Sequence, residues 1–541
     1  MQKFQRTTIF ILLFLCVPPV WAASSFDGDW VGGFERPESQ VYVHTHFGTA
    51  TNGTTGKIDV IDPLCKGKLP QIDLQFELEL GYVPNTWIVG RPLDKLELTP
   101  PHVRFEMADK DTPMSFDGQV TNGVMTGVVE DRGMNLPFRL DLTAKIDPSR
   151  YTGIYQAALG HFITIYPDAP DLLSFDTQSG QVCLLVPRSN TDFVWSSGVK
   201  IYLVQATIHF TTNRLGQVTA LQWKPENAPA MVGTRIKALP EDEVSFTNGN
   251  VTLSGTLLLP PTKGPHPAVV IMNGSSPWVR SAARFIGDFF ALNGVVALIY
   301  DKRGCGRSTG DLSTSGYDDL AGDALAGLEL LKNRPDINPH QIGLWGISQG
   351  GYIVPLAASR CADVAFIISV SGPGITPEAQ MAYCVEHWMK AAGYSKADVN
   401  EAGSLYLLNC RYQRTGSDWN KVEAARKAAQ NKPWYNACPM LDASAVDKLS
   451  LLTWTYDPVP TLHKVHCPVL SVYGELDPLV PAKESADIWE TALREAGNHD
   501  VVIKIFPIAV HAMQDTRTGL QVPGFWILQR EWLLKHVTVN N

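Results

Sequence analysis

The stretch IGLWGISQGGYIVPLAA, residues 342–358, places one serine between an apolar run and a segment that can begin a helix. Ser348 stands between Gly346 and Gly350, in the pattern Gly-x-Ser-x-Gly. When its serine is a nucleophile, this pattern needs a strand before it and a helix after it, with the serine at a strained backbone angle. Side chains at 346 and 350 would collide with the neighbours of such a turn. The stretch therefore predicts a nucleophile at Ser348, against the alternative of an ordinary serine in a glycine-rich turn.

Five short runs in this half of the chain predict a parallel sheet, because they are apolar without alternation, as are strands buried on both faces. The runs are residues 268–272, 295–300, 342–346, 365–370 and 468–474. Between two of them, apolar residues recur at the spacing of a helix. They are Leu320, Ala324, Leu328 and Leu331. Strands that alternate with helices indicate an α/β fold, here preceded by a hairpin at 243–260 that turns at NGN.

The chain before this fold is predicted to be all β. Residues 23–147 contain alternating runs such as HVRFEM at 102–107 and read as a β-barrel or a sandwich. Residues 148–240 form a second β unit, because YTGIY at 151–155 repeats the aromatic-x-Gly-x-aromatic opening that FDGDW gives to the first unit. Neither unit gathers His, Asp, Glu or Cys side chains that suggest chemistry. We therefore expect both units to be accessory domains.

One interval interrupts the alternation of strands and helices. Residues 375–461 are helical in character and carry four tryptophans, at 388, 419, 434 and 454. A helical insertion that follows the strand after the nucleophile is well placed to be a lid. Its tryptophans suggest an apolar pocket for the substrate, or else the insertion's own core. The catalytic domain is accordingly expected to span residues 241–541, with this insertion inside it.

The first residues predict export. Lys3 and Arg6 precede an apolar run at 9–20, and Ala22 fits the position before a cleavage site, so residues 1–22 read as a signal peptide. A lipoprotein cysteine at Cys16 is the alternative, but the leucine before it is too large for that processing site. We expect a periplasmic or extracellular protein with no stable membrane span. Eight of the nine cysteines remain after cleavage, scattered without CxxC, and most are expected to be free buried thiols.

A nucleophilic serine needs a base, and the base needs an acid. His511 follows the apolar segment 501–506, which places it at the carboxyl edge of a parallel sheet, where ligands bind. Asp477 lies in the loop beyond the run at 468–474, and Glu475 is the alternative acid. The other histidines considered precede a strand or lie in the terminal helix. They are His463, His466, His499 and His536.

An oxyanion hole needs two N–H donors. We expect one from the backbone of Gln349, directly after the nucleophile, and one from Ser275 or Gly274, in the loop NGSSP at 273–277. Nearby, YDKRGCGRSTGD at 300–311 lacks the spacing of a dinucleotide fingerprint. We interpret it as a turn in which Asp301 and Arg303 form a structural ion pair.

These motifs carry a family resemblance. Residues 241–541, a little over half of the chain, resemble the α/β-hydrolase superfamily in its bacterial esterase and serine-aminopeptidase-like branch. GISQGG resembles the nucleophile turn of that branch, residues 300–311 its signature after the fourth strand, and CPVLSVYGELDPLVP at 467–481 its acid loop. The resemblance implies a serine hydrolase with Ser348, Asp477 and His511 as its triad. The chain departs from it in the oxyanion loop, where relatives often carry His-Gly and this chain carries Asn-Gly.

The leading functional hypothesis is a carboxylesterase that acts on a small-molecule ester or acyl substrate without a metal or organic cofactor. The alternatives are a serine peptidase of the aminopeptidase or prolyl-oligopeptidase type, a thioesterase or acyltransferase, and a binding protein on a hydrolase scaffold. The formal net charge of −9 disfavours nucleic acid as a partner. The oligomeric state does not follow from the sequence.

Overall fold

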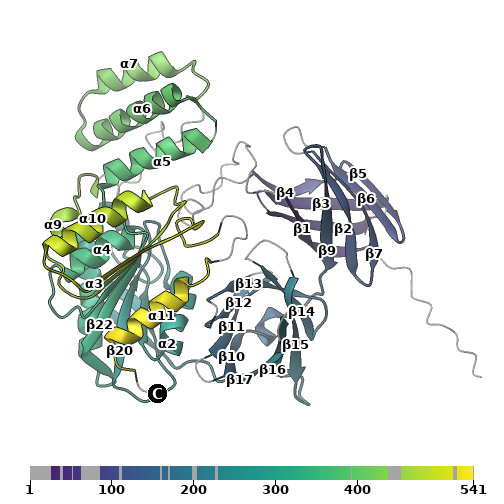
Figure 1. Ribbon diagram of the computed structural model, residues 1–541, viewed down its shortest axis with the longest axis horizontal. Coiled ribbons are helices and arrows are strands. Elements are labelled where there is room, and N and C mark those ends of the chain that lie inside the picture. Colours follow the sequence, from purple (N-terminus) through teal and green to yellow (C-terminus); the bar gives the residue numbers. More distant parts are fainter. Residues whose placement is uncertain are drawn as a thin grey trace, which may run out of the picture.

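The computed structural model describes residues 26–36, 40–50, 53–62, 86–108, 113–158, 161–168, 171–178, 180–197, 204–225, 229–391, 393–435, 453–515 and 521–539. The predicted signal peptide, with its cleavage site near Ala22 and the alternative at Cys16, lies outside these residues, as does part of the expected helical insertion. The chain folds into two β units and one α/β unit, which Figure 1 shows with the α/β unit on the left.

The first β unit is a single antiparallel sheet in the order β4-β3-β2-β1-β9-β8-β7-β6-β5. Its strands are β1 (Gly28–Glu35), β2 (Gln40–Ala50), β3 (Gly53–Asp62), β4 (Thr86–Pro92), β5 (Lys95–Thr99), β6 (His102–Met107), β7 (Met114–Thr121), β8 (Val124–Asp131) and β9 (Met134–Leu142). Phe47 on β2 contacts Phe105 on β6, with ring centroids 5.5 Å apart, although these strands are not neighbours in the sheet. The sheet therefore curls around one aromatic core, with the described strands in one sheet and not in a closed barrel.

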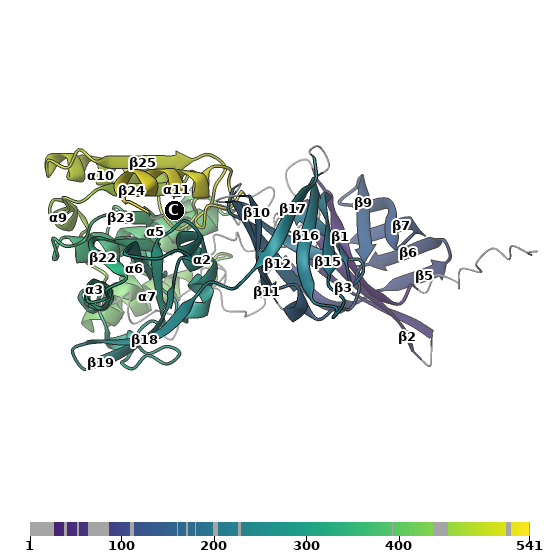
Figure 2. The same cartoon turned by 90° about the horizontal axis from the view of Figure 1, so that it is seen from below.

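The second β unit is a closed antiparallel barrel (Figure 2). Its strands are β10 (Gly153–Ala158), β11 (His161–Asp168), β12 (Asp171–Asp176), β13 (Val182–Pro187), β14 (Asp192–Ser197), β15 (Val204–Thr212), β16 (Val218–Pro225) and β17 (Met231–Ile236). Inside the barrel Phe210 packs against both Tyr151 and Phe193, with ring centroids 4.9 and 5.0 Å apart. Closure leaves the barrel without an unpaired edge.

The shared opening of the two β units has a structural counterpart. The glycine in each opening has a positive φ, 137° in the first and 149° in the second. Trp30 Nε1 donates a hydrogen bond to the carbonyl of Phe26 at 2.9 Å, and the Tyr155 hydroxyl donates to the carbonyl of Tyr151 at 2.7 Å. In both units the second aromatic side chain thus bonds to the backbone four residues earlier and is buried at the start of the first strand.

The α/β unit is built on a sheet in the order β18-β19-β21-β20-β22-β23-β24-β25, antiparallel at the β18–β19 hairpin and its junction with β21, and parallel beyond. The strands are β18 (Glu241–Asn248), β19 (Val251–Leu258), β20 (His266–Met272), β21 (Val296–Tyr300), β22 (Ile337–Ile347), β23 (Ile367–Val370), β24 (Val469–Gly474) and β25 (Val501–Phe506). The five apolar runs thus correspond to β20–β24, and the predicted hairpin is confirmed.

Helices cover both faces of this sheet, which explains why its strands are apolar without alternation. On β20, Val270 packs toward α3 (Tyr317–Lys332), α4 (Gln349–Ala358) and α10 (Ala482–Glu495). Its neighbour Val269 faces the opposite side, toward α2 (Arg284–Leu292) and α11 (Phe525–His536). The helix predicted from Leu320, Ala324, Leu328 and Leu331 is α3, and all four side chains are buried. The short helix α9 (Val459–Leu462) lies just before β24.

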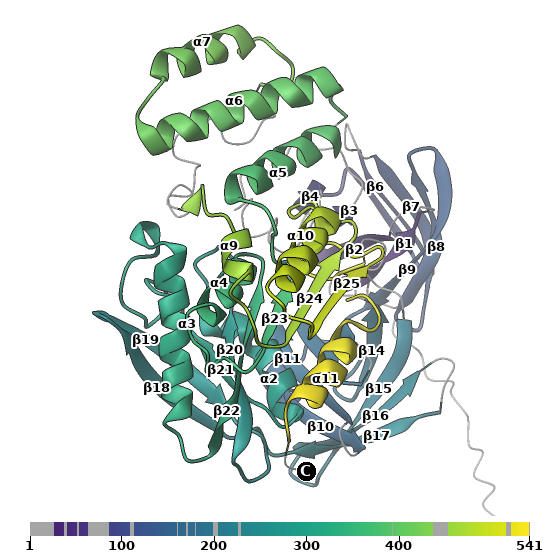
Figure 3. The same ribbon diagram turned by 60° about the vertical axis from the view of Figure 1, so that its left-hand side comes forward.

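The segment between β23 and β24 is helical, with α5 (Pro377–Ala391), α6 (Lys396–Thr415) and α7 (Trp419–Ala429) stacked above the sheet (Figure 3). Trp434 and Trp454 are buried in a core of the segment's own, together with residues of α5 and α6. Trp388 packs beside β24, and the Trp419 side chain is 42% exposed. The four tryptophans therefore do not gather in one substrate pocket, and the insertion's own core accounts for two of them.

Two further observations bear on the sequence-based expectations. No described helix is long and apolar enough to cross a membrane. Four of the six cysteines in the described ranges are buried, and no two of these six form a disulfide with each other.

The barrel and the α/β unit share one hydrophobic core. Phe175 on β12 packs against Trp526 on α11 and Phe289 on α2, with ring centroids 5.6 and 6.3 Å apart. Beside them the Tyr166 hydroxyl of the barrel donates a hydrogen bond of 2.8 Å to Asp288 of α2. Burial raises the pKa of Asp288 above its ordinary value, although the Arg284 charge acts against this rise. The two units are therefore docked by buried contacts.

Replacing Phe175 with alanine is expected to lower the free energy of unfolding of the α/β unit, although the residue belongs to the barrel. Removal of a buried Phe side chain costs about 3–5 kcal/mol. Urea titration followed by tryptophan fluorescence measures the change. Leu215→Ala is the matched control, because Leu215 belongs to the same barrel and is 83% exposed. Equal stability of the two variants would contradict a shared core.

Candidate active site

Ser348 lies in a sharp turn between β22 and α4. Its φ and ψ are 56° and −116°, a strained conformation for a residue with a side chain. A Cβ at Gly346 would lie 2.5 Å from the carbonyl oxygen of Gly350, and a Cβ at Gly350 would lie 2.8 Å from that of Met272. The prediction that both positions require glycine is therefore confirmed. The Ser348 N–H also donates to the carbonyl of Val370 at 2.9 Å, which ties the turn to the neighbouring strand.

Asp477 and His511 form a buried pair beyond the ends of β24 and β25. His511 Nδ1 lies 2.8 Å from Asp477 Oδ2, and both side chains are completely buried. The other carboxylate oxygen accepts the N–H groups of Leu479 and Val480 at 2.8 and 2.9 Å. Three hydrogen bonds thus fix the carboxylate in place. Glu475, the alternative acid, is exposed on the preceding turn.

The remaining nitrogen of His511, Nε2, is buried and has no hydrogen-bond partner among the residues that the structure describes. Because Nδ1 faces a carboxylate, Nδ1 carries the proton in the neutral ring and Nε2 is the acceptor. A buried acceptor without a partner is costly, so it favours a proton donor beside it. The hydrogen bond to Ser348 Oγ is not formed within the described residues, and such bonds are often long until substrate binds.

Two of the other histidines considered from the sequence have partners elsewhere, and the remaining two, His466 and His499, are exposed. His463 Nε2 lies 3.1 Å from Glu495, and His536 Nε2 lies 3.2 Å from Asp500. Both contacts are formed by exposed carboxylates at the edge of the α/β unit opposite the turn of Ser348.

Ser371 and Gly474 hold the loop of His511, and sequence reasoning missed both. The Ser371 hydroxyl donates to the carbonyl of His511 at 2.7 Å, and its φ of 49° places it in the left-handed region. A Cβ at Gly474 would lie 2.5 Å from the carbonyl oxygen of Ala509, so only glycine lets β24 approach this loop. The signal for Ser371 was available, because a small polar residue directly follows the strand next to the nucleophile strand.

The helical segment begins against the loop of Asp477. The Tyr383 hydroxyl on α5 donates to the carbonyl of Asp477 at 2.8 Å, and Cys384 Sγ lies 3.3 Å from the carbonyl of Leu479. Burial, aided by the Asp477 charge, raises the pKa of Tyr383 to about 12, so the phenol keeps its proton for this bond. The first helix of the insertion is therefore attached to the loop that holds the carboxylate.

The two segments expected to supply oxyanion donors lie side by side. The loop of Gly274 and Ser275 follows β20, and Gln349 begins α4, the helix after the Ser348 turn. Lys302 is the second residue after β21, and its side chain bridges the two segments. Its Nζ donates to the carbonyl of Gly274 at 2.6 Å and to Gln349 Oε1 at 2.7 Å. Sequence reasoning passed over Lys302, although a lysine at the end of an apolar strand is itself a signal.

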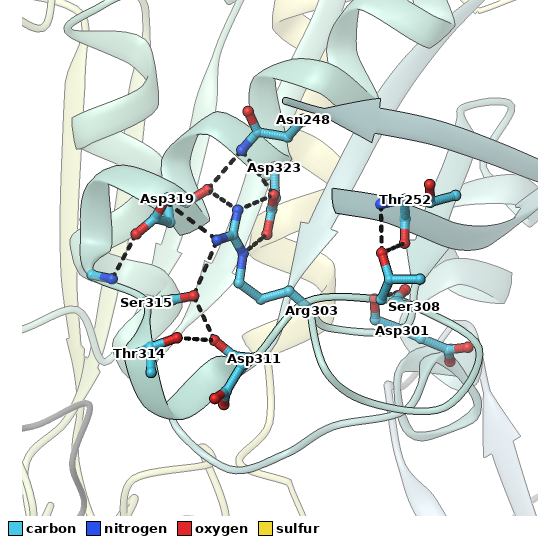
Figure 4. Close-up of polar contacts among 12 residues, drawn as sticks. Asn248, Thr252, Asp301, Arg303, Ser308, Asp311, Thr314, Ser315, Asp319 and Asp323 are labelled. Carbon is cyan, nitrogen blue, oxygen red and sulfur yellow. Dashed lines mark hydrogen bonds and ion pairs between the residues drawn. The ribbon is translucent and has the colours of Figure 1, made fainter. Parts of the chain in front are cut away.

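The expected ion pair between Asp301 and Arg303 is wrong. Arg303 instead forms a buried two-pronged pair with Asp323 on α3, with both N–O distances 2.7 Å (Figure 4). Asp301 accepts the backbone N–H groups of Arg280 and Arg307 at 2.8 and 2.9 Å. Carboxylates bond readily to backbone N–H groups, so neighbouring opposite charges need not pair.

An open cavity of about 310 Å³ adjoins the oxyanion loop. It is lined by Ser275, Pro277, Gly304, Cys305, Gly310, Asp311, Leu312 and Ser313. In the part of the chain that the structure describes, no group of three or more His, Cys, Asp or Glu side chains is arranged to hold a metal ion.

Comparison with known proteins gives the family. Residues 263–515 match the family model described as serine aminopeptidase, S33. A polyketide transferase of a Penicillium species is 31% identical over 138 residues, 25% of this chain and 45% of that protein. A thiohydrolase of Aspergillus aculeatus is 32% identical over 130 residues, 24% of this chain and 40% of that protein. The chain therefore matches less than half of the length of these relatives.

A solved structure of a Penicillium α/β-hydrolase is 19% identical, with a TM-score of 0.36, and covers 55% of this chain and 99% of its own. The family match spans the turn of Ser348, the acid loop and His511, which lie beyond the carboxyl ends of β22, β24 and β25 in one sheet. Residues 263–515, which make up most of the α/β unit, thus match an α/β-hydrolase family.

Proposed function

We propose that this protein is an exported serine hydrolase that cleaves carboxylic esters through an acyl-enzyme intermediate. One observation carries the proposal: a strained serine turn and a buried Asp477–His511 pair lie at the same edge of one sheet, beyond the carboxyl ends of β22, β24 and β25. In the proposal Ser348 is the nucleophile, His511 the base and Asp477 the acid that orients it. Export rests on the sequence of residues 1–22.

Acylation begins when Ser348 Oγ attacks the ester carbonyl carbon and its proton passes to His511 Nε2. The π electrons of the carbonyl move to its oxygen, which accepts the N–H groups of Gln349 and Ser275. The bond from the carbonyl carbon to the alcohol oxygen then breaks. The leaving oxygen takes the proton from His511, and the acyl group stays on Ser348.

Deacylation repeats these steps with water. A water molecule gives a proton to His511 Nε2 as its oxygen attacks the acyl carbon, and Ser348 Oγ leaves with that proton. Asp477 stabilises the imidazolium in both halves of the reaction without taking its proton. The open cavity beside Ser275 provides room for one part of the ester. The insertion, attached to the acid loop through Tyr383, is proposed as the lid.

Hydrolysis or transfer of a thioester acyl group is the second candidate. It is favoured by the names of the relatives, a thiohydrolase of Aspergillus aculeatus and an acyltransferase of Aspergillus calidoustus, the latter 30% identical over 182 residues. The same serine and histidine chemistry serves an ester and a thioester. The two candidates differ only in the leaving group and in whether water or another nucleophile receives the acyl chain.

Ser348→Ala is expected to abolish covalent labelling by a fluorophosphonate, because phosphonylation forms a bond to the serine oxygen. Labelling is measured on the purified protein by gel fluorescence and intact mass. Ser404→Ala is the control, because Ser404 is exposed on α6, and it should label like the wild type. A panel of p-nitrophenyl esters, acyl thioesters and aminoacyl anilides ranks the substrate classes. Equal labelling of Ser348→Ala would contradict the proposal, and cleavage of anilides alone would change it to a peptidase.

Asp477→Asn is expected to lower kcat for an ester about 10⁴-fold with little change in KM, because the amide favours the wrong tautomer of the histidine. Glu475→Gln provides the comparison and should keep kcat within about 2-fold, since the Glu475 side chain is exposed. Steady-state kinetics on one p-nitrophenyl ester measures both. A large loss in Glu475→Gln together with an active Asp477→Asn would reassign the acid.

A further inference from the structure

We propose that Lys302 is a positioning residue of the oxyanion hole: its buried ammonium group holds the two backbone segments whose N–H groups bind the developing negative charge. This inference rests on the proposed serine hydrolase function. It assigns a role to a side chain that does not touch the reacting atoms.

Both backbone segments are hydrogen-bonded to one atom, Nζ of Lys302. The Nζ atom donates to three successive carbonyls of one loop, those of Gly274, Ser275 and Ser276, at 2.6, 3.2 and 3.3 Å. It also donates to Gln349 Oε1 at 2.7 Å. A neutral amine has only two N–H donors, whereas an ammonium has three, so four neutral acceptors favour the charged form. Lys302 as a whole residue is only 8% exposed, so these carbonyls replace water around the charge.

Peptide geometry then fixes the direction of the loop's donors. In a trans peptide unit the N–H points away from the carbonyl of the residue before it. Because the carbonyls of Gly274 and Ser275 face Lys302, the N–H groups of Ser275 and Ser276 face the opposite side. The third carbonyl, of Ser276, precedes a proline and has no N–H behind it. The sequence left Gly274 and Ser275 open as the donor, and the contacts of Lys302 favour Ser275.

The second donor is fixed from the other side of the same ammonium group. Gln349 contributes its backbone N–H at the first position of α4, where the helix leaves its N–H groups without intrahelical partners. Its side chain is only 7% exposed and is bonded to Lys302. The distance between the two donors is therefore set by one buried cation. That cation, together with the start of the helix, also makes the site favourable for negative charge.

The neighbouring Arg303 offers a matched control. It is similarly buried, but its partners are Asp323, Ser315 and the carbonyl of Asp319, none of which belongs to the oxyanion loop (Figure 4). Arg303→Lys keeps a charge for Asp323 and loses the two-pronged bond. It should destabilise the fold without a specific effect on the oxyanion donors.

The test compares Lys302→Met with Arg303→Lys and the wild type. Methionine keeps the unbranched shape of the side chain up to its fourth heavy atom and removes its charge and donors. Active sites are first counted by fluorophosphonate titration, so that misfolded protein does not enter kcat. Two quantities are then measured: kcat and KM for a p-nitrophenyl ester, and the affinity for an alkyl trifluoromethyl ketone, which forms an anionic hemiketal with the serine. Loss of one oxyanion donor lowers kcat about 10²–10³-fold.

For Lys302→Met we expect a loss of kcat of about 10²-fold, a KM within about 3-fold of the wild type, and a parallel loss of affinity for the ketone. Arg303→Lys should lower the melting temperature, with little change in kcat or in the affinity for the ketone. If Lys302→Met does not fold, Gln349→Met gives the same test, because it removes one acceptor of Lys302 and keeps the backbone N–H. Its loss should be smaller and equally shared between kcat and ketone affinity.

The role of Lys302 is overturned if the wild type is active and Lys302→Met has the same kcat and the same ketone affinity as Arg303→Lys. Where Lys302→Met does not fold, the same result for Gln349→Met overturns it. A wild type that neither labels nor hydrolyses any ester or thioester instead removes the proposed function. The two failures are therefore distinguishable by the behaviour of the wild type alone.

Discussion

The backbones around Ser348 approach one another more closely than ordinary side chains allow. Gly346 faces the carbonyl of Gly350, Gly350 faces the loop after β20, and Gly351 meets Gly372 after β23. The position of every other group at this edge of the sheet depends on this contact. If the strand ends were farther apart, the carbonyl of Val370 would not reach the N–H of Ser348, and the oxyanion loop would not lie beside α4.

The strain at Ser348 is stabilised by the packing around it. A residue held in an unfavourable φ/ψ region costs about 1–3 kcal/mol and persists where its surroundings determine its position. Here α4 is buried along almost its whole length, and β20 and β23, the neighbours of β22 in the sheet, are buried throughout. Ser371 repeats the arrangement one strand farther along, with a positive φ and a hydroxyl that bonds to the backbone of His511. Two strained serines, one after β22 and one after β23, thus set the relative position of the nucleophile turn and the histidine loop.

Much of the fold was predictable, because its signals are local. Apolar runs without alternation gave the parallel sheet, and the spacing of Leu320, Ala324, Leu328 and Leu331 gave α3. The glycines at 346 and 350 could be explained from the turn alone. The curl of the first β sheet could not be predicted, because barrel, sandwich and curled sheet share one alternating pattern and differ in contacts between distant strands.

The partners of charged side chains were harder to predict than the positions of the candidate site residues. Asp301, Lys302 and Arg303 are consecutive, yet they bond in three different directions. All three residues lie beyond the end of β21, outside any strand, so their spacing in the sequence does not determine which partners they face. The barrel also covers apolar surface of the α/β unit. Trp526 and Phe289 lie against Phe175, and the same core contains Met513 and Val522 beside the histidine loop. A shortened chain that begins at the hairpin would expose this apolar surface to water. To stay soluble, it would need polar residues in place of the apolar ones that the barrel now covers.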